Sequence, residues 1–190
     1  EILGILALSE QAEGVFAGGV VGTQMSNLGL ELALGDAGIP FVRARVGDRY
    51  VLDELRRNGW QLGGEGSGHI VCLGHTTTGD GTVAALRIAH LMHRTGKPLS
   101  ELRRVMQKYP QTLINVPIDG AADAVLDTPA VRSIVDQVRA ELAETGRVLL
   151  RPSGTEPLVR VMVEGRDLDQ IEAAAARIAG VIRGALGASG

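Results

Sequence analysis

Residues 60–74 read WQLGGEGSGHIVCLG, and this stretch decides how the N-terminal part of the chain is interpreted. A short apolar segment, Trp60–Leu62, and a continuous apolar run, Ile70–Leu73, lie on either side of a glycine-rich loop. Apolar runs of this length that end at glycines are typical of buried strands. The stretch therefore predicts two strands that bracket a polar loop.

Outward from this stretch, helix and strand signals alternate through the first 108 residues. Amphipathic segments follow Met25 and Thr76, and a period-two segment at Phe41–Val46 indicates a half-buried strand. The residues expected to cap the predicted helices are Ser26, Asp48, Asp80 and Ser100. This alternation predicts a layered α/β domain over residues 1–108.

The pattern changes near residue 109. A strand at Thr112–Ile118 precedes a helix that begins at Thr128–Pro129, and two strands follow at Arg147–Leu150 and Leu158–Glu164. An alanine-rich helix ends the chain. The order β-α-β-β-α predicts a small α+β, TBP-like domain over residues 109–190.

Composition and charge restrict the function classes. The 190 residues contain 19 Lys and Arg against 22 Asp and Glu, with only 3% aromatic residues, so no nucleic-acid surface is expected. No apolar run approaches the roughly 20 residues that cross a bilayer, so no membrane segment is expected either. A single cysteine, Cys72, excludes an internal disulfide and favours the cytoplasm. Because Cys72 lies in an apolar run, we expect it to be packed rather than reactive.

The loop between the two N-terminal strands carries a carboxylate, a hydroxyl and an imidazole, on Glu65, Ser67 and His69. Its glycines leave little side chain to cover the backbone, so a ligand can approach closely. The carboxylate can accept from two neighbouring hydroxyls, the serine can donate or accept, and the imidazole titrates near neutral pH. These groups suit recognition of a polyol. An ordinary turn with Glu65 in solvent accounts equally well for the local pattern.

The turn between the two C-terminal strands reads RPSGTEP over residues 151–157 and offers the groups that hold a phosphate. It combines a guanidinium, two hydroxyls and a backbone opened by glycine. Arg160, on the following strand, adds a second positive charge. The predicted phosphate-binding residues are Arg151, Ser153, Gly154, Thr155 and Arg160. Proline, serine, glycine and threonine also form ordinary β-turns, which is the alternative.

Other polar residues have simpler explanations. Asp48 follows a strand and could line the same cleft, but capping of the next helix explains it without a ligand. His90 and His93 share a predicted helix face without further metal ligands beside them, so a structural or solvent-facing role is favoured. The acidic residues form no Asp-x-Asp-x-Asp cluster for magnesium, and we assign no metal site to this chain.

These two loops, with further segments in the same order, resemble the α-D-phosphohexomutase superfamily. The matching segments are GVVGT at 19–23 with MSN at 25–27, VGDRYV at 46–51, GE and SGH within 64–69, TTTGDG at 76–81, and residues 151–160. They span nearly the whole chain. Gly66 departs from the family, whose members usually carry a larger residue there, and it is expected to make the loop more flexible.

The resemblance implies four domains in a complete protein, of which this chain holds the third and fourth, with the first two preceding Glu1. In the family a serine of the first domain is phosphorylated and an aspartate-rich loop of the second binds Mg²⁺, and neither motif occurs here. The likeness is nearest to members that interconvert glucosamine 6-phosphate and glucosamine 1-phosphate through a hexosamine bisphosphate, on the route to UDP-N-acetylglucosamine and peptidoglycan. Members acting on mannose or glucose phosphates are one alternative, and a non-catalytic sugar-phosphate binding module is another.

The resemblance also assigns roles to the two loops. Glu65 and Ser67 are expected to bind sugar hydroxyls, the Arg151–Arg160 segment to bind phosphate, and His69 to be a candidate acid or base. The two loops are expected to face one pocket. Without the phosphoserine and the magnesium loop, the chain by itself is predicted to be inactive.

Overall fold

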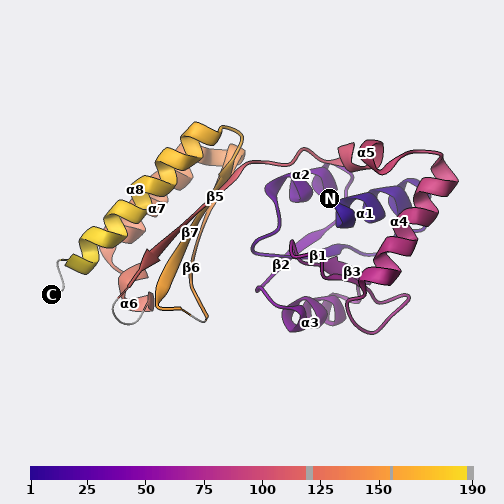
Figure 1. The fold of residues 1–190 in the computed structure, drawn as a ribbon, viewed down its shortest axis with the longest axis horizontal. Helices are drawn as coiled ribbons and strands as arrows, with labels where there is room; N and C mark the ends of the chain where they lie inside the picture. The colour runs from indigo at the N-terminus through magenta and orange to yellow at the C-terminus, as the bar shows by residue number, and fades with distance from the viewer. Residues whose placement is uncertain (119–121, 155, 188–190) are drawn as a thin grey trace. The chain divides into compact units, whose positions relative to one another are not determined.

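A computed structural model describes residues 1–118, 122–154 and 156–187. The chain divides into two compact units, Glu1–Lys108 and Tyr109–Gly190. Each unit contains one β-sheet and its own apolar core (Figure 1). The predicted fold class, a layered α/β domain followed by a small α+β domain, is confirmed.

The first unit is built on a four-stranded sheet. Its strands are β1 (Val20–Thr23), β2 (Phe41–Ala44), β3 (Leu62–Gly64) and β4 (Ile70–Cys72), in the order β2-β1-β3-β4. Strand β1 runs parallel to both of its neighbours, and β4 pairs antiparallel with β3 at the edge. The two strands predicted around the glycine-rich loop therefore form a hairpin. Strand β3 begins at Leu62, so the predicted start at Trp60 was two residues early.

Helices cover both faces of this sheet. Helices α1 (Ile2–Ala12), α2 (Leu28–Asp36) and α4 (Gly81–Thr95) bury their apolar residues against one face. Helix α3 (Asp48–Asn58) packs on the other face, where Val51 and Leu55 contact Val21 and Val71 of the sheet in a smaller cluster. Helix α5 (Leu99–Leu102) and a 3₁₀ turn, η1 (Arg103–Val105), end the unit.

Three of the four helix caps predicted in this unit are wrong. Helix α5 follows Pro98, so Ser100 lies inside that helix. Helix α2 is capped by Asn27, whose side chain accepts a hydrogen bond from the Gly29 amide, because Ser26 is turned inward and accepts from the Thr23 amide at 2.9 Å. Helix α3 follows Gly47, and Asp48 is its first residue and makes no capping bond. Asp80 does cap α4, since its carboxylate accepts from the amides of Thr82 and Val83.

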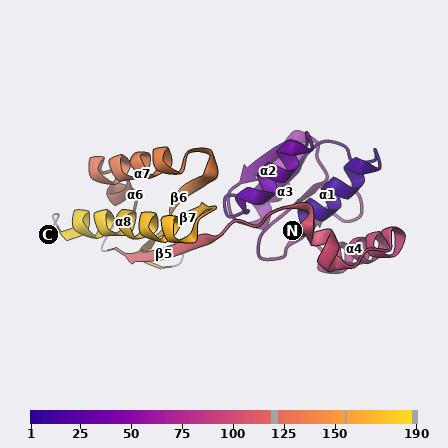
Figure 2. The same ribbon diagram turned by 90° about the horizontal axis from the view of Figure 1, so that it is seen from above.

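The second unit has a three-stranded antiparallel sheet, in the order β5-β7-β6. The strands are β5 (Gln111–Pro117), β6 (Gly146–Pro152) and β7 (Leu158–Gly165). Helices α7 (Pro129–Leu142) and α8 (Leu168–Gly187) lie side by side over one face and bury a core of valine, isoleucine and alanine (Figure 2). A short helix that the sequence did not predict, α6 (Ala122–Leu126), precedes α7, and a 3₁₀ turn, η2 (Ala143–Thr145), follows it.

Within the part of the chain that the structure describes, no helix combines the length and the apolar character needed to span a membrane.

Candidate functional site

The carboxyl ends of the parallel strands define one candidate region in the first unit. Because β1, β2 and β3 run parallel, the loops 24–27, 45–47 and 65–69 leave the sheet at the same edge. The helix after β1 packs on one face of the sheet and the helix after β2 packs on the other. In open α/β sheets, ligands bind where successive connections part in this way.

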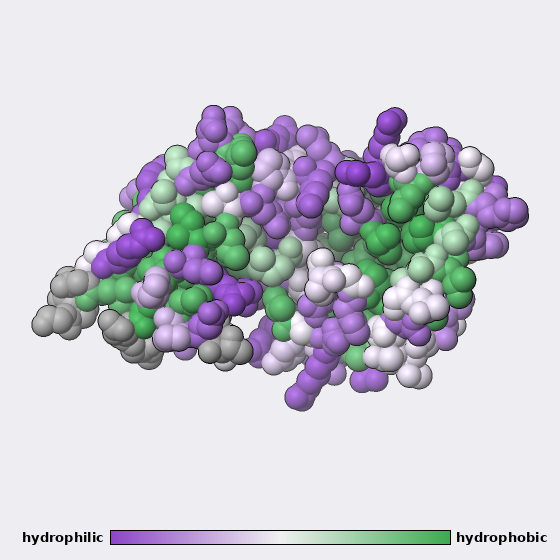
Figure 3. All heavy atoms as spheres, viewed as in Figure 1, coloured by the Kyte–Doolittle hydropathy of each residue, from purple (hydrophilic) through white to green (hydrophobic). Residues whose placement is uncertain are grey.

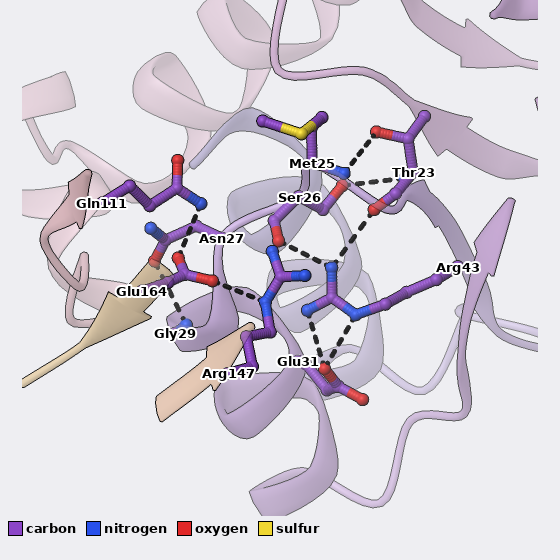
Figure 4. A network of polar contacts seen from close by, with 10 residues as sticks. All are labelled: Thr23, Met25, Ser26, Asn27, Gly29, Glu31, Arg43, Gln111, Arg147 and Glu164. Carbon is purple, nitrogen blue, oxygen red and sulfur yellow. Dashed lines mark hydrogen bonds and ion pairs between the residues drawn. The ribbon is translucent and has the colours of Figure 1, made fainter. Parts of the chain in front are cut away.

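Arg43 fixes the loop after β1, as the first-unit part of Figure 4 shows. Its Nη1 donates to the carbonyl oxygens of Thr23 and Ser26 at 3.1 and 2.6 Å. Its Nε and Nη2 donate to Oε2 of Glu31 on α2, at 3.0 and 2.7 Å. The sequence identified Arg43 only as a polar position of an alternating strand, and nothing in the local pattern indicates this role.

The predicted sugar-binding loop is a tight turn between β3 and β4. The Glu65 amide donates to the His69 carbonyl at 2.9 Å, and the Gly68 amide donates to the Glu65 carbonyl at 3.1 Å. Glu65 and His69 are partly buried, whereas Ser67 and Gly66 are exposed. A Cβ at position 66 would meet no heavy atom within 4 Å, so the space around the loop does not require glycine there.

Asp48 joins this loop, which corrects the interpretation of Asp48 as a helix cap. Its Oδ2 lies 3.1 Å from Nε2 of His69. Gly47, at φ 129°, provides the backbone conformation that starts α3 one residue earlier, so the Asp48 side chain turns toward the loop instead of capping. Glu65 lies beside it. Burial and the negative charge of Asp48 raise the pKa of Glu65 above its ordinary value.

The second unit carries the predicted phosphate-binding turn between β6 and β7. Arg151 and Arg160 face each other directly across these antiparallel strands. Each Nε is buried and has no hydrogen-bond partner among the described residues. The Nη2 of Arg160 lies 3.3 Å from Oγ of Ser153 and 3.4 Å from Oε2 of Glu156. Gly154 is exposed, and the predicted residue Thr155 lies outside the described residues.

Two like charges in directly opposed positions of a sheet destabilise it unless something neutralises them. Burial, together with the charge of Arg160, lowers the pKa of the Arg151 guanidinium. Glu156 contacts Arg160 from an exposed position and offsets part of the charge of the pair. The turn therefore retains an excess of positive charge with buried donors, which suits a phosphate dianion.

Other candidate residues have structural surroundings. Cys72 is buried, and burial raises the pKa of its thiol to about 11, so its predicted packing role is confirmed. His90 and His93 are exposed on α4. Among residues 1–118, 122–154 and 156–187, no group of three or more His, Cys, Asp and Glu side chains is arranged to hold a metal ion.

An apolar groove of about 520 Å³ lies between α1 and α4 of the first unit. Leu6, Val83 and Leu91 line it, and the ion pairs Glu10–Arg87 and Glu13–Arg94 cross it. Figure 3 shows apolar residues reaching the surface on this side. The arginines of the groove are neutralised by these glutamates, so it offers less positive charge to a sugar phosphate, and the two loops remain the better candidates.

Comparison with known proteins gives matches to both units of the chain. The family model described as "Phosphoglucomutase/phosphomannomutase, alpha/beta/alpha domain III" matches residues 1–109, and the one described as "Phosphoglucomutase/phosphomannomutase, C-terminal domain" matches residues 113–181. The phosphoglucosamine mutase of Thioalkalivibrio sulfidiphilus is 60% identical over 185 residues, and that of Azotobacter vinelandii is 54% identical over 182 residues. Each match covers 96% of this chain and 41% of the relative, so the chain spans about two fifths of the length of these relatives.

Solved structures share the fold. N-acetylphosphoglucosamine mutase of Aspergillus fumigatus, in complex with GlcNAc-6P and magnesium, has a TM-score of 0.81 at 19% identity, covering 97% of this chain and 43% of that one. A putative phosphomannomutase of Thermus thermophilus has a TM-score of 0.63 at 20% identity, covering 96% and 40%. The two family models match in succession and the first alone covers more than half of the residues, so the resemblance inferred from the sequence is confirmed: the chain belongs to the phosphoglucomutase/phosphomannomutase family.

Proposed function

We propose that this chain is the sugar- and phosphate-binding part of a phosphoglucosamine mutase. The complete enzyme would interconvert glucosamine 6-phosphate and glucosamine 1-phosphate in the cytoplasm, through an enzyme phosphoserine and a hexosamine bisphosphate. Support comes from relatives named phosphoglucosamine mutase at 60% and 54% identity. Because the chain spans about two fifths of those relatives, we expect no mutase turnover from these 190 residues by themselves.

The observation that carries the proposal is the opposed pair Arg151 and Arg160. Their Nε atoms are buried and unpartnered among the described residues, and their charges face each other across two strands. A phosphate dianion would accept hydrogen bonds from both guanidinium groups and cancel their repulsion. Ser153, already within 3.3 Å of Arg160, would add a hydroxyl donor. Gly154 and Thr155 complete the proposed phosphate loop.

Glu65 and Ser67 are proposed to bind the sugar hydroxyls. The carboxylate of the partly buried Glu65 can accept from a sugar hydroxyl, and the exposed Ser67 hydroxyl can donate or accept. His69 is the proposed acid or base of this loop, because an imidazole can exchange a proton near neutral pH. In a phosphoryl transfer reaction, such groups chiefly position the sugar, while the phosphate loop holds the phosphate that is not reacting.

Magnesium enters the proposal through relatives, since the A. fumigatus structure contains it. The described residues of this chain do not fit a magnesium site, because no three His, Cys, Asp or Glu side chains come together. No step in these two domains is therefore assigned to the metal, and we propose that the ion acts in the complete enzyme outside them.

Phosphate titration of the chain tests the phosphate loop. The chain should bind inorganic phosphate weakly, and Arg151→Ala should weaken that binding about 10- to 100-fold, the equivalent of about 1.5–3 kcal/mol for charge-assisted hydrogen bonds. Arg183→Ala, an exposed position on α8, serves as the matched control and should bind as the wild type does. Isothermal titration calorimetry at constant ionic strength gives both affinities. Equal affinities for wild type and Arg151→Ala would rule out the assigned loop.

Sugar specificity needs a separate comparison, since one fold relative is named a putative phosphomannomutase and another a phosphoglucomutase/phosphomannomutase family protein. Turnover of glucosamine 6-phosphate and of mannose 6-phosphate by the complete protein would decide between the two substrate classes. We expect preference for glucosamine 6-phosphate, because the relatives of high identity carry that activity in their names. A complete protein that binds sugar phosphates without turnover of either would instead support a binding module.

A further inference from the structure

The contact between Asp48 and His69 has a direct consequence for the protonation of the imidazole. Nε2 of His69 is fully buried and lies 3.1 Å from Oδ2 of Asp48. Its N–H direction does not point straight at the oxygen, so the contact is an electrostatic pair rather than a linear hydrogen bond. An unprotonated Nε2 would place a partial negative charge 3.1 Å from the carboxylate oxygen, whereas a protonated Nε2 places a partial positive charge there. The contact therefore favours the forms of the ring that carry the proton on Nε2.

The ring has little freedom to turn away from this contact. Gly79 lies against it so closely that an added Cβ there would come within 1.9 Å of Nε2. Gly79 is itself fixed, since it forms a β-bridge with Val71, and the neighbouring Asp80 amide donates to the Ile70 carbonyl at 2.9 Å. The His69 backbone is tied to Glu65 by the hydrogen bond that closes the turn.

The Asp48 carboxylate is stabilised by its place at the start of helix α3. Asp48 is the first residue of the 11-residue helix α3, where the partial positive charge of the helix end stabilises an anion. Asp48 faces the imidazole from α3, and Glu65 faces it from its own turn. The neighbouring Arg49 is directed to Asp53 on the same helix, at 3.9 Å.

We propose that Asp48 is a positioning residue for His69, which keeps the proton on Nε2 and leaves Nδ1 as the nitrogen that meets a ligand. The functional meaning of this contact rests on the proposed sugar-binding role of the loop. A histidine with a defined tautomer presents one acceptor in its neutral form, and that acceptor can take a proton from a sugar hydroxyl. Asp48 thus defines the tautomer of His69, which Glu65, Ser67 and His69 of the loop would not define by themselves.

Ring-nitrogen NMR of the unliganded chain tests the proposal. Two-bond proton–nitrogen spectra of ¹⁵N-histidine at about pH 8.5, some two units above the ordinary histidine value, report which nitrogen carries the proton. His69 is identified among the four histidines by its loss in His69→Gln. The wild type should show the Nε2–H pattern. In Asp48→Ala the separation between the two nitrogen signals should shrink as the other tautomer appears, because the negative charge beside Nε2 is lost.

Asp53→Ala, on the same helix and away from the loop, is the matched control and should leave the ring signals unchanged. An Nδ1–H pattern in the wild type would overturn the proposal by itself. The test therefore remains decisive even if Asp48→Ala folds poorly. Wild-type signals in a folded Asp48→Ala chain would also overturn it, as would an equal shift in the control.

Sugar-phosphate binding supplies the second measurement. Asp48→Ala should weaken glucosamine 6-phosphate binding about two- to tenfold, which corresponds to the loss of one hydrogen bond between His69 and a sugar hydroxyl. The same substitution should leave inorganic phosphate binding unchanged. Failure of the wild type to bind the sugar phosphate would overturn the proposed function alone, since the ring-nitrogen spectra are recorded without ligand. Unchanged sugar affinity in Asp48→Ala, with the expected spectra, would overturn the contribution of Asp48 to binding.

Discussion

Replacement of Arg43 by alanine should destabilise the first unit more than the loss of its ion pair alone would predict. The guanidinium makes four contacts, two to the carboxylate of Glu31 and two to the main-chain carbonyls of Thr23 and Ser26. The Arg43 side chain is only 19% exposed and that of Glu31 is 43% exposed. The carboxylate can therefore regain water when the arginine is lost, whereas the loop carbonyls are less able to do so.

These contacts separate into two contributions of different size. A partly exposed ion pair contributes about 0.5–1 kcal/mol. A hydrogen bond that involves a charged group contributes about 1.5–3 kcal/mol, and the Thr23 carbonyl keeps a second donor, the Ser26 amide at 2.9 Å. We therefore expect Arg43→Ala to lower the free energy of unfolding of this unit by about 2–4 kcal/mol, and Glu31→Gln by about 0.5–1 kcal/mol.

Urea unfolding followed by the fluorescence of Trp60 measures this difference. Trp60 is the single tryptophan and lies in the first unit, packed against Gly18 and Gly19, so its signal reports that unit without contribution from the other. Following one unit avoids treating a two-unit chain as a single two-state transition. A loss in Arg43→Ala no larger than that in Glu31→Gln would refute the reasoning, because it would show that the carbonyl contacts contribute nothing.

Two further predictions concern titration and reactivity. Burial and the charge of Asp48 raise the pKa of Glu65, so the folded chain holds the Glu65 proton to a higher pH than the unfolded chain does. The stability that this proton contributes is fully present below the ordinary pKa of 4.5 and is lost as the pH rises through the pKa of the folded state. Glu65→Gln should therefore gain stability relative to wild type as pH rises above 4.5 in Trp60-monitored unfolding, and parallel pH profiles would contradict this. The thiol pKa of Cys72 is about 11, so roughly one molecule per thousand should carry the thiolate at pH 8. Cys72 should therefore react with a thiol reagent far more slowly in buffer than in urea. Equal rates in the two solvents would show that Cys72 is accessible in the folded chain.

The parts of the fold that the sequence predicted well are those determined by local residues. Helix α8 starts after Asp167, whose carboxylate accepts from the Gln170 amide, and helix α7 begins with Pro129 after Thr128. Both signals lie within a few residues of the helix they start, so no distant contact decides them. The apolar run at β4 was placed correctly for the same reason.

The failed predictions are those in which a distant contact competes with the local preference. Ser26 has the side chain of a helix cap, but its hydroxyl is used by the Thr23 amide at the end of β1, and Asn27 takes the cap instead. Asp48 was assigned to its own helix, and its contact with His69 exists only because β2 and β3 both lie parallel to β1 and end at the same edge. A signal was present in the glycine before Asp48, which marked an unusual turn at that strand end.

The candidate site was predictable where its residues are contiguous. Glu65, Ser67 and His69 lie within five positions, and the phosphate turn lies between two strands that were both expected. The direct opposition of Arg151 and Arg160 was not predictable, because it depends on the register of β6 against β7, and one residue of slip would move the two side chains to opposite faces.

Both loops place like charges together in the unliganded chain, and this shared feature distinguishes them from ordinary turns. Arg151 faces Arg160 across a sheet, and Glu65 lies beside Asp48 at the end of another. Such arrangements oppose folding, so a chain that only needed a turn at these places would gain stability by replacing one member of each pair. A phosphate relieves the first repulsion and a proton on Glu65 or His69 relieves the second. The two loops should therefore respond to different solutes, phosphate and acid, which is what separate phosphate-holding and proton-handling roles require.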